Sequence, residues 1–147
     1  MPDQVDTQAP PGRAQTAQFM DRAVLVVEDE PFMAIDVALT FEGEGARTLH
    51  AANCAQAEHA IAAVGGPEGL IGAVLDIRLG EEETVRPIAE RLRGANVAFV
   101  FHTALSDSAA RRLAGVEALC VSKPSTPDQL VEALRIALAG REARTTH

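Results

Sequence analysis

The segment Ala23–Pro31 reads AVLVVEDEP, five apolar residues followed by three acids and a proline. An uninterrupted apolar run of this kind is typical of a strand that is buried on both faces of a parallel sheet. Proline suits the first turn of a helix, because the backbone N–H that it lacks has no partner there. The segment therefore predicts a central strand over residues 23–27, an acidic turn, and a helix that begins at Pro31.

The rest of the chain repeats this alternation of short apolar runs and helix-like stretches, which is typical of α/β proteins. Phe32, Ile35 and Leu39 recur at helical spacing as the apolar stripe of the first helix. Asn53 and Thr84 are suited to cap the second and third helices. We expect further strands at 47–51, 71–77, 97–101 and 117–121, and helices at 31–42, 54–64, 84–93, 106–113 and 126–139. The sequence thus predicts a doubly wound parallel sheet of five strands flanked by five helices.

The composition narrows the classes of function. The 147 residues carry 21 acids and 13 basic residues, for a net charge of -8, and Lys123 is the single lysine. Such an acidic surface repels phosphate backbones, so we expect no direct binding of nucleic acid or of an anionic membrane. The chain has five Phe and no Trp or Tyr, which is a poor supply for stacking nucleotide bases.

The chain length fits one compact domain. Residues 1–21 are rich in Pro, Gln and Asp, and we expect them to be a disordered extension, followed by a domain at 22–140 and a tail at 141–147. We find no signal peptide and no apolar run of about 20 residues, so a cytoplasmic location is expected. Cys54 and Cys120 lack metal-ligand spacing, and we expect them to be small buried apolar side chains.

Polar side chains gather at the predicted strand ends, where open α/β sheets bind ligands. Glu28 and Asp29 follow the first strand, Asp76 ends the third, Thr103 follows the fourth and Lys123 the fifth. Carboxylates held together repel one another, and a hard cation such as Mg²⁺ relieves this repulsion. An aspartate can accept a phosphoryl group, which a lysine and a hydroxyl can bind. These residues predict a Mg²⁺-dependent phosphoryl-accepting site.

Four segments in order resemble the strand ends of two-component response regulator receiver domains: VLVVEDEP at 24–31, AVLD at 73–76, FHTA at 101–104 and VSKP at 121–124. The resemblance covers about residues 22–140 and implies the flavodoxin-like receiver fold. It implies a phosphoacceptor that receives its phosphoryl group from a sensor histidine kinase or a histidine phosphotransfer protein. Such a chain is not an enzyme, apart from catalysing its own phosphorylation and dephosphorylation.

The resemblance also assigns roles to single residues. Asp76 takes the place of the phosphoacceptor, and Thr103 and Lys123 match the residues that bind the phosphoryl group and take part in the switch. Lys123 precedes Pro124, which the family usually joins through a cis peptide bond. The implied cofactor is Mg²⁺ or Mn²⁺, and its implied ligands are Glu28, Asp29, Asp76 and the backbone carbonyl of Arg78.

The sequence departs from the family pattern at three places. Its acidic pair is Glu28–Asp29 rather than two aspartates, and Cys120 stands where the family carries its switch aromatic. The loop after Asp76 has Gly80 at a site often held by proline, followed by three acids at 81–83. Three acids beside the site are expected to disfavour an arriving phosphoryl group electrostatically or to steer the choice of partner.

Only residues 141–147 follow the last predicted helix, so we expect no output domain and an output through a downstream protein partner. A homodimer through the last strand–helix face, where Ile136 projects away from the apolar stripe, is the other interaction that the resemblance implies. The alternative function is a receiver-like interaction module that works without phosphorylation, which Cys120 and the acidic loop favour.

Two enzyme-like readings fit less well. Phosphatases with an aspartate nucleophile commonly carry a second aspartate two residues on, where this chain has Arg78. No glycine-rich turn follows the first strand, which argues against a dinucleotide-binding domain. His102 can in principle shuttle a proton, but we expect it to be a partly exposed residue at a strand end without a chemical role.

Overall fold

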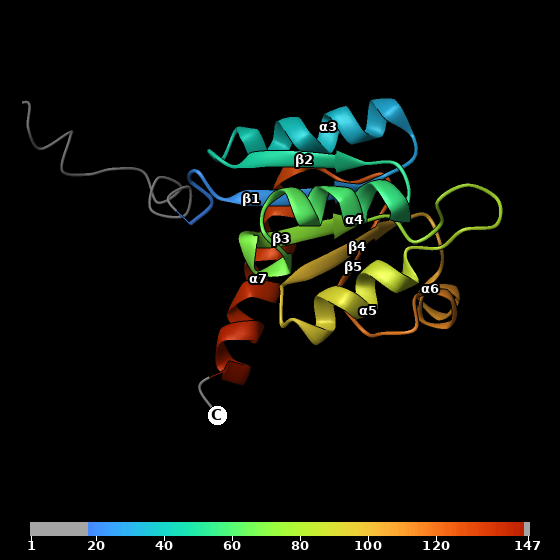
Figure 1. Ribbon diagram of the computed structural model, residues 1–147. Helices are drawn as coiled ribbons and strands as arrows, with labels where there is room; N and C mark the ends of the chain where they lie inside the picture. The colour runs from blue at the N-terminus through green and yellow to red at the C-terminus, as the bar shows by residue number, and fades with distance from the viewer. Residues whose placement is uncertain (1–17, 146–147) are drawn as a thin grey trace, which may run out of the picture.

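The computed structural model describes residues 18–145. Within them, five parallel strands form one sheet in the order β2-β1-β3-β4-β5 (Figure 1). The strands are β1 (Ala23–Val27), β2 (Arg47–Ala51), β3 (Leu70–Leu75), β4 (Phe99–Thr103) and β5 (Cys120–Ser122). The helices are α3 (Pro31–Glu42), α4 (Cys54–Ala63), α5 (Arg86–Gly94), α6 (Asp107–Ala114) and α7 (Pro127–Thr145), with a 3-10 turn η1 at Pro67–Gly69. The predicted doubly wound five-stranded sheet with five helices is confirmed.

Helices cover both faces of the sheet, and each face has its own core. Leu25 and Val27 of β1 face a cluster built with α4, α5 and α6. Val24 and Val26 face the opposite cluster, built with α3 and α7. Every residue of β1, β3 and β4 is buried, as expected for strands covered on both sides. None of the helices in the described part of the chain combines the length and the apolar character that crossing a bilayer requires.

The apolar stripe expected on the first helix does not face the sheet. Helix α3 spans the predicted residues, and the Glu30 side chain caps it by accepting a 2.7 Å hydrogen bond from the Met33 N–H. However, Phe32, Ile35 and Leu39 are 80%, 56% and 59% exposed. The buried residues of the helix are instead Ala34, Val37 and Phe41. Because α3 has apolar residues around most of its circumference, spacing alone cannot select the face that packs.

The described structure begins before residue 22. Phe19 is fully buried and meets the Phe41 ring edge-on, with ring centroids 5.6 Å apart and an angle of 77° between the planes. The Arg135 guanidinium of α7 lies 5.8 Å from the Phe19 centroid on the same side. The expected disordered extension therefore cannot include Phe19, and residues 1–17 lie outside the described residues. At the other end, α7 continues through Thr145, past the expected tail boundary.

Other boundaries shift because loop backbone groups bond to neighbouring elements. The Val85 N–H donates to the Ile77 carbonyl over 2.8 Å, so α5 begins two residues after the predicted start and Thr84 is not its cap. The Val97 N–H donates to the Leu92 carbonyl of α5 over 2.9 Å, so β4 begins at Phe99 rather than at Val97. Strand β5 is three residues long and begins later than its apolar run suggests.

We expect Phe19→Ala to lower the free energy of unfolding by about 3 kcal/mol, because it empties a fully buried aromatic site. Urea titrations followed by circular dichroism measure this change in a chain without Trp or Tyr. Phe32→Ala removes the same side chain from an exposed position and is expected to cost less than about 0.5 kcal/mol. Equal losses in the two variants would contradict this account of the packing.

Candidate functional site

The carboxyl ends of β1 and β3 bring the predicted acids together. These strands are neighbours, with Val27 in register with Leu75, and the Asp76 N–H donates to the Val27 carbonyl over 2.8 Å. One carboxylate oxygen from each of Glu28, Asp29 and Asp76 lies within 4.8 Å of the others. Glu28 and Asp76 are buried and Asp29 is exposed. Three acids from two strand ends thus converge on one point at this edge of the sheet.

Lys123 reaches the three acids from the β5 margin of the sheet. Its Nζ donates to Glu28 Oε1 over 2.9 Å and to Asp76 Oδ2 over 3.0 Å. Lys123 follows β5, which is separated from β3 by β4, so the long side chain crosses the end of β4 to reach both acids. Its own N–H is held by the Thr103 carbonyl at 2.9 Å. The Lys123–Pro124 bond is cis, the isomer that the family resemblance implies.

Burial and pairing set the charges at this point. Burial raises the pKa of Glu28 to about 7, against the lowering effect of its hydrogen bond with Lys123. Burial also acts to lower the pKa of Lys123, but the hydrogen bonds with Glu28 and Asp76 outweigh it and the pKa is raised. Lys123 therefore remains an ammonium ion beside three acids, of which Glu28 is partly protonated at neutral pH. The negative charge that it leaves uncompensated suits a hard divalent cation with oxygen ligands.

Two further predicted residues lie at the same edge of the sheet. Thr103 ends β4 and is buried, and its hydroxyl oxygen accepts a 3.1 Å hydrogen bond from the Leu105 N–H. Arg78 follows Asp76 at a distance of two residues, with an exposed side chain and a backbone that pairs with Thr84 in an antiparallel bridge. The implied role of the Arg78 backbone carbonyl as a metal ligand stays a prediction.

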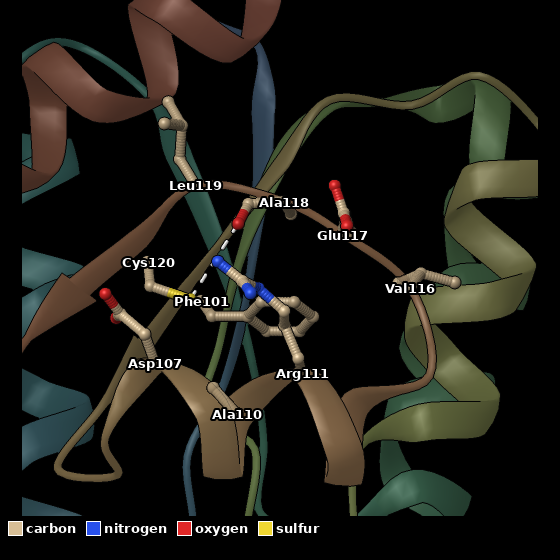
Figure 2. A pocket seen from close by; sticks show the side chains of 9 residues that line it. All are labelled: Phe101, Asp107, Ala110, Arg111, Val116, Glu117, Ala118, Leu119 and Cys120. Atoms are coloured by element: carbon tan, nitrogen blue, oxygen red, sulfur yellow. Dashed lines mark hydrogen bonds between the residues drawn. The ribbon is translucent and has the colours of Figure 1, made fainter.

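A cavity of about 230 Å³ opens beside Cys120, where the family resemblance implies an aromatic side chain (Figure 2). Figure 2 shows the Arg111 side chain extending from α6 among the residues that line this cavity. Cys120 is exposed, and its thiol makes a long hydrogen bond of 3.8 Å to the Ala118 carbonyl. The expectation of a buried side chain is wrong for Cys120, because β5 is the outer strand of the sheet.

The structure also corrects the expectation for His102. This residue lies within β4 and is 2% exposed, and its Nε2 is 3.0 Å from Ser125 Oγ. Its Nδ1 is a buried atom without a hydrogen-bond partner. Burial lowers the pKa of His102, and the positive charge of Lys123 acts in the same direction. β4 lies inside the sheet rather than at its margin, so even its last residues are covered.

Glu83 is the residue whose position sequence reasoning missed. The three acids at 81–83 were expected to act together on the site, but the Glu83 carboxylate binds the N-terminus of α4. Its Oε2 accepts a 2.9 Å hydrogen bond from the Cys54 N–H. The partners are 29 residues apart, and no local pattern points to their contact. The acidic loop is therefore divided, with Glu81 and Glu82 exposed and Glu83 half-buried.

We expect Glu28 to make stability depend on pH in solutions without Mg²⁺. The pKa of Glu28 is raised from 4.5 to about 7 in the folded chain, so between these pH values the folded chain holds more protons than the unfolded one. The contribution of Glu28 to the free energy of unfolding therefore falls as the pH rises. Glu28→Gln lacks this titration. Wild-type stability minus that of Glu28→Gln should decrease from about pH 5 to about pH 7.5 in urea titrations. A constant or increasing difference would contradict this assignment.

Comparisons with known proteins add to this geometry. No protein-family model matches the sequence, and a search of curated proteins finds no match. Solved structures do match. A response regulator receiver protein from Sinorhizobium medicae WSM419 is 20% identical, with a TM-score of 0.70 over 82% of this chain and 97% of that chain.

Two other solved structures give the same result. The N-terminal domain of a response regulator/sensory box/GGDEF protein from Carboxydothermus hydrogenoformans is 24% identical, with a TM-score of 0.70 over 84% of this chain and 99% of that chain. A CheY-like response regulator receiver domain protein from Methanospirillum hungatei JF-1 is 20% identical, with a TM-score of 0.65 over 84% and 98% of the two chains. Most of this chain therefore has the fold of response regulator receiver domains.

Proposed function

We propose that the chain is a response regulator that accepts a phosphoryl group on Asp76. The receiver fold supports a role of this general kind. The observation that carries the proposal is the contact of Lys123 Nζ with Asp76 Oδ2 at 3.0 Å inside a cluster of three acids. The contact supports the proposal because a carboxylate that could act as nucleophile, a cation that could bind the incoming group and two further acids lie together at one edge of the sheet.

The chemistry needs few protein groups. A carboxylate oxygen of Asp76 attacks the phosphorus of a phosphohistidine, forming a P–O bond while the P–N bond breaks and the imidazole leaves. Lys123 remains protonated and can bond an oxygen of the transferred group, and the Thr103 hydroxyl can donate to another. Mg²⁺ or Mn²⁺, held by Glu28, Asp29, Asp76 and the Arg78 carbonyl, would supply positive charge beside the phosphoryl oxygens. We also propose a cytoplasmic location for the chain, as part of the same function.

Asp76→Asn is expected to abolish phosphorylation, because an amide oxygen is a poor nucleophile. Incubation of the wild-type chain with a small-molecule phosphodonor and Mg²⁺ should add about 80 Da, the mass of one phosphoryl group. Mass spectrometry of both proteins checks this. Failure of the wild-type chain to acquire the adduct from small donors and from candidate kinases would contradict the proposal. That outcome would favour the alternative of an interaction module that works without phosphorylation, for which Cys120 at the switch position is the supporting observation.

The phosphoryl donor is proposed to be a sensor histidine kinase or a histidine phosphotransfer protein that contacts α3. This helix begins two residues after Asp29, so its first turn borders the acid cluster. Phe32, Ile35 and Leu39 expose an apolar stripe that leads away from that border. A protein that brings a phosphohistidine to Asp76 from this side would cover the stripe and bury it.

Phe32→Ala should slow phosphotransfer from such a kinase about fivefold, equivalent to about 1 kcal/mol, by removing an apolar contact of the docked complex. Its rate with a small-molecule donor should not change, because Asp76 and Lys123 remain in place. Leu119→Ala, which shortens an exposed apolar residue beside β5, serves as the matched control. The proposed docking site would be wrong if Phe32→Ala slowed both donors equally or neither.

The proposed output surface lies at the margin of the sheet that β5 forms, next to α7. Leu119 and Ile136 are exposed and line one apolar hollow between β5 and α7. A downstream protein partner, or a second copy of the chain that forms a homodimer, would bury these side chains. The adjoining cavity at Cys120 makes this surface differ from that of a receiver with an aromatic switch residue.

A further inference from the structure

The loop between β3 and α5 follows Asp76 and projects outward from the sheet (Figure 1). It folds back on itself as a hairpin. Its two arms are joined by the bridge between Arg78 and Thr84 and by a 2.9 Å hydrogen bond from the Leu79 N–H to the Glu83 carbonyl. Gly80, at φ +92°, provides the turn at its tip. Any movement of this hairpin therefore moves the backbone of Arg78, two residues from Asp76.

The hairpin is fastened to α4 by two contacts. The Glu83 carboxylate accepts the Cys54 N–H at 2.9 Å, and the Cys54 thiol donates to the Thr84 carbonyl over 3.3 Å. The Asn53 side chain already accepts the Gln56 N–H of the same helical turn, so Glu83 satisfies a different free amide. A carboxylate is favoured at this end of a helix because the helix dipole is positive there.

We propose that Glu83 is a positioning residue for the phosphoryl-accepting site. Its carboxylate fixes the hairpin against α4 and thereby fixes the Arg78 carbonyl relative to Asp76. The inference rests on the proposed function, in which that carbonyl binds the metal ion. Glu83 therefore differs in role from Glu81 and Glu82. Glu81 and Glu82 add negative charge near the site, whereas Glu83 holds the loop backbone in position.

The test compares charge removal at neighbouring positions. Glu83→Ala should weaken Mg²⁺ binding, measured by calorimetry, about tenfold, as is common when a group that orients a metal ligand is lost. Glu81→Ala and Glu82→Ala remove the same charge from exposed positions and should change the affinity by less than about twofold. The rate of phosphorylation by a small-molecule donor should fall in Glu83→Ala alone. If negative charge were the whole effect, all three variants would instead react faster.

A second pair of variants removes the donor instead of the acceptor. Cys54 is the first residue of α4, a position that tolerates proline, so Cys54→Pro deletes the N–H that Glu83 binds and keeps the helix. Cys54→Ala retains the N–H and controls for the lost thiol. We expect Cys54→Pro to weaken Mg²⁺ binding as Glu83→Ala does, and to add no further loss when combined with it. Glu83→Gln, which keeps an acceptor oxygen, should recover most of the affinity.

The outcomes separate this inference from the proposed function. A wild-type chain that neither binds Mg²⁺ nor accepts a phosphoryl group would overturn both. If the wild-type chain binds Mg²⁺ and accepts a phosphoryl group, two results would overturn the inference alone. One is a Glu83→Ala variant with normal Mg²⁺ affinity. The other is a double variant whose loss of Mg²⁺ affinity is the sum of the losses in Glu83→Ala and Cys54→Pro. Urea titrations of each variant measure its stability separately from its Mg²⁺ affinity. A purely structural contact would lower the stability and leave the Mg²⁺ affinity of the folded chain unchanged.

Discussion

The ion pairs of Lys123 with Glu28 and Asp76 are the interaction on which the site depends. Parallel strands end at the same edge of the sheet, so the fold that buries β1 and β3 also forces their terminal acids together. Carboxylates at such separations repel, and a partly buried ammonium offsets part of that repulsion. Because Lys123 comes from β5, the pairing also ties the short outer strand to the centre of the sheet. Binding chemistry and strand docking thus rest on the same side chain.

The acids around this point act in two ways. Glu28, Asp29 and Asp76 present oxygens to a common centre. Glu30 and Glu83 instead accept backbone N–H groups at the N-termini of α3 and α4. Each of these two carboxylates fixes a segment that flanks the site, the turn after β1 or the hairpin after β3. The acidic excess of the sequence therefore includes both acids that converge on one point and acids that hold the neighbouring segments in place.

The sequence specified some of these features more fully than others. The position of Asp76 could be predicted because an uninterrupted apolar run ends at it, and that of Lys123 because it follows the last apolar run by two residues. Strand ends in this class of sheet meet at one edge. The packing of α3 could not be predicted, because that helix is apolar on several sides and part of its buried face packs against Phe19, which lies before β1 in the chain. The contact of Glu83 with Cys54 joins residues of separate loops and leaves no trace in spacing or periodicity. The burial of His102 could not be predicted either, because it depends on β4 extending to Thr103.

The open position at Cys120 gives this protein an accessible chemical handle. Of its two cysteines, Cys54 has its pKa raised to about 12 by burial and by the neighbouring Glu83, so its thiolate is scarce at neutral pH. Burial also raises the pKa of Cys120, but this residue is exposed at the rim of a cavity, on the strand that leads to Lys123, whereas Cys54 is half-buried. A thiol-directed fluorophore would therefore attach there selectively. In a chain without Trp or Tyr, such a label would report optically on the strand that connects the acidic site with the outer surface.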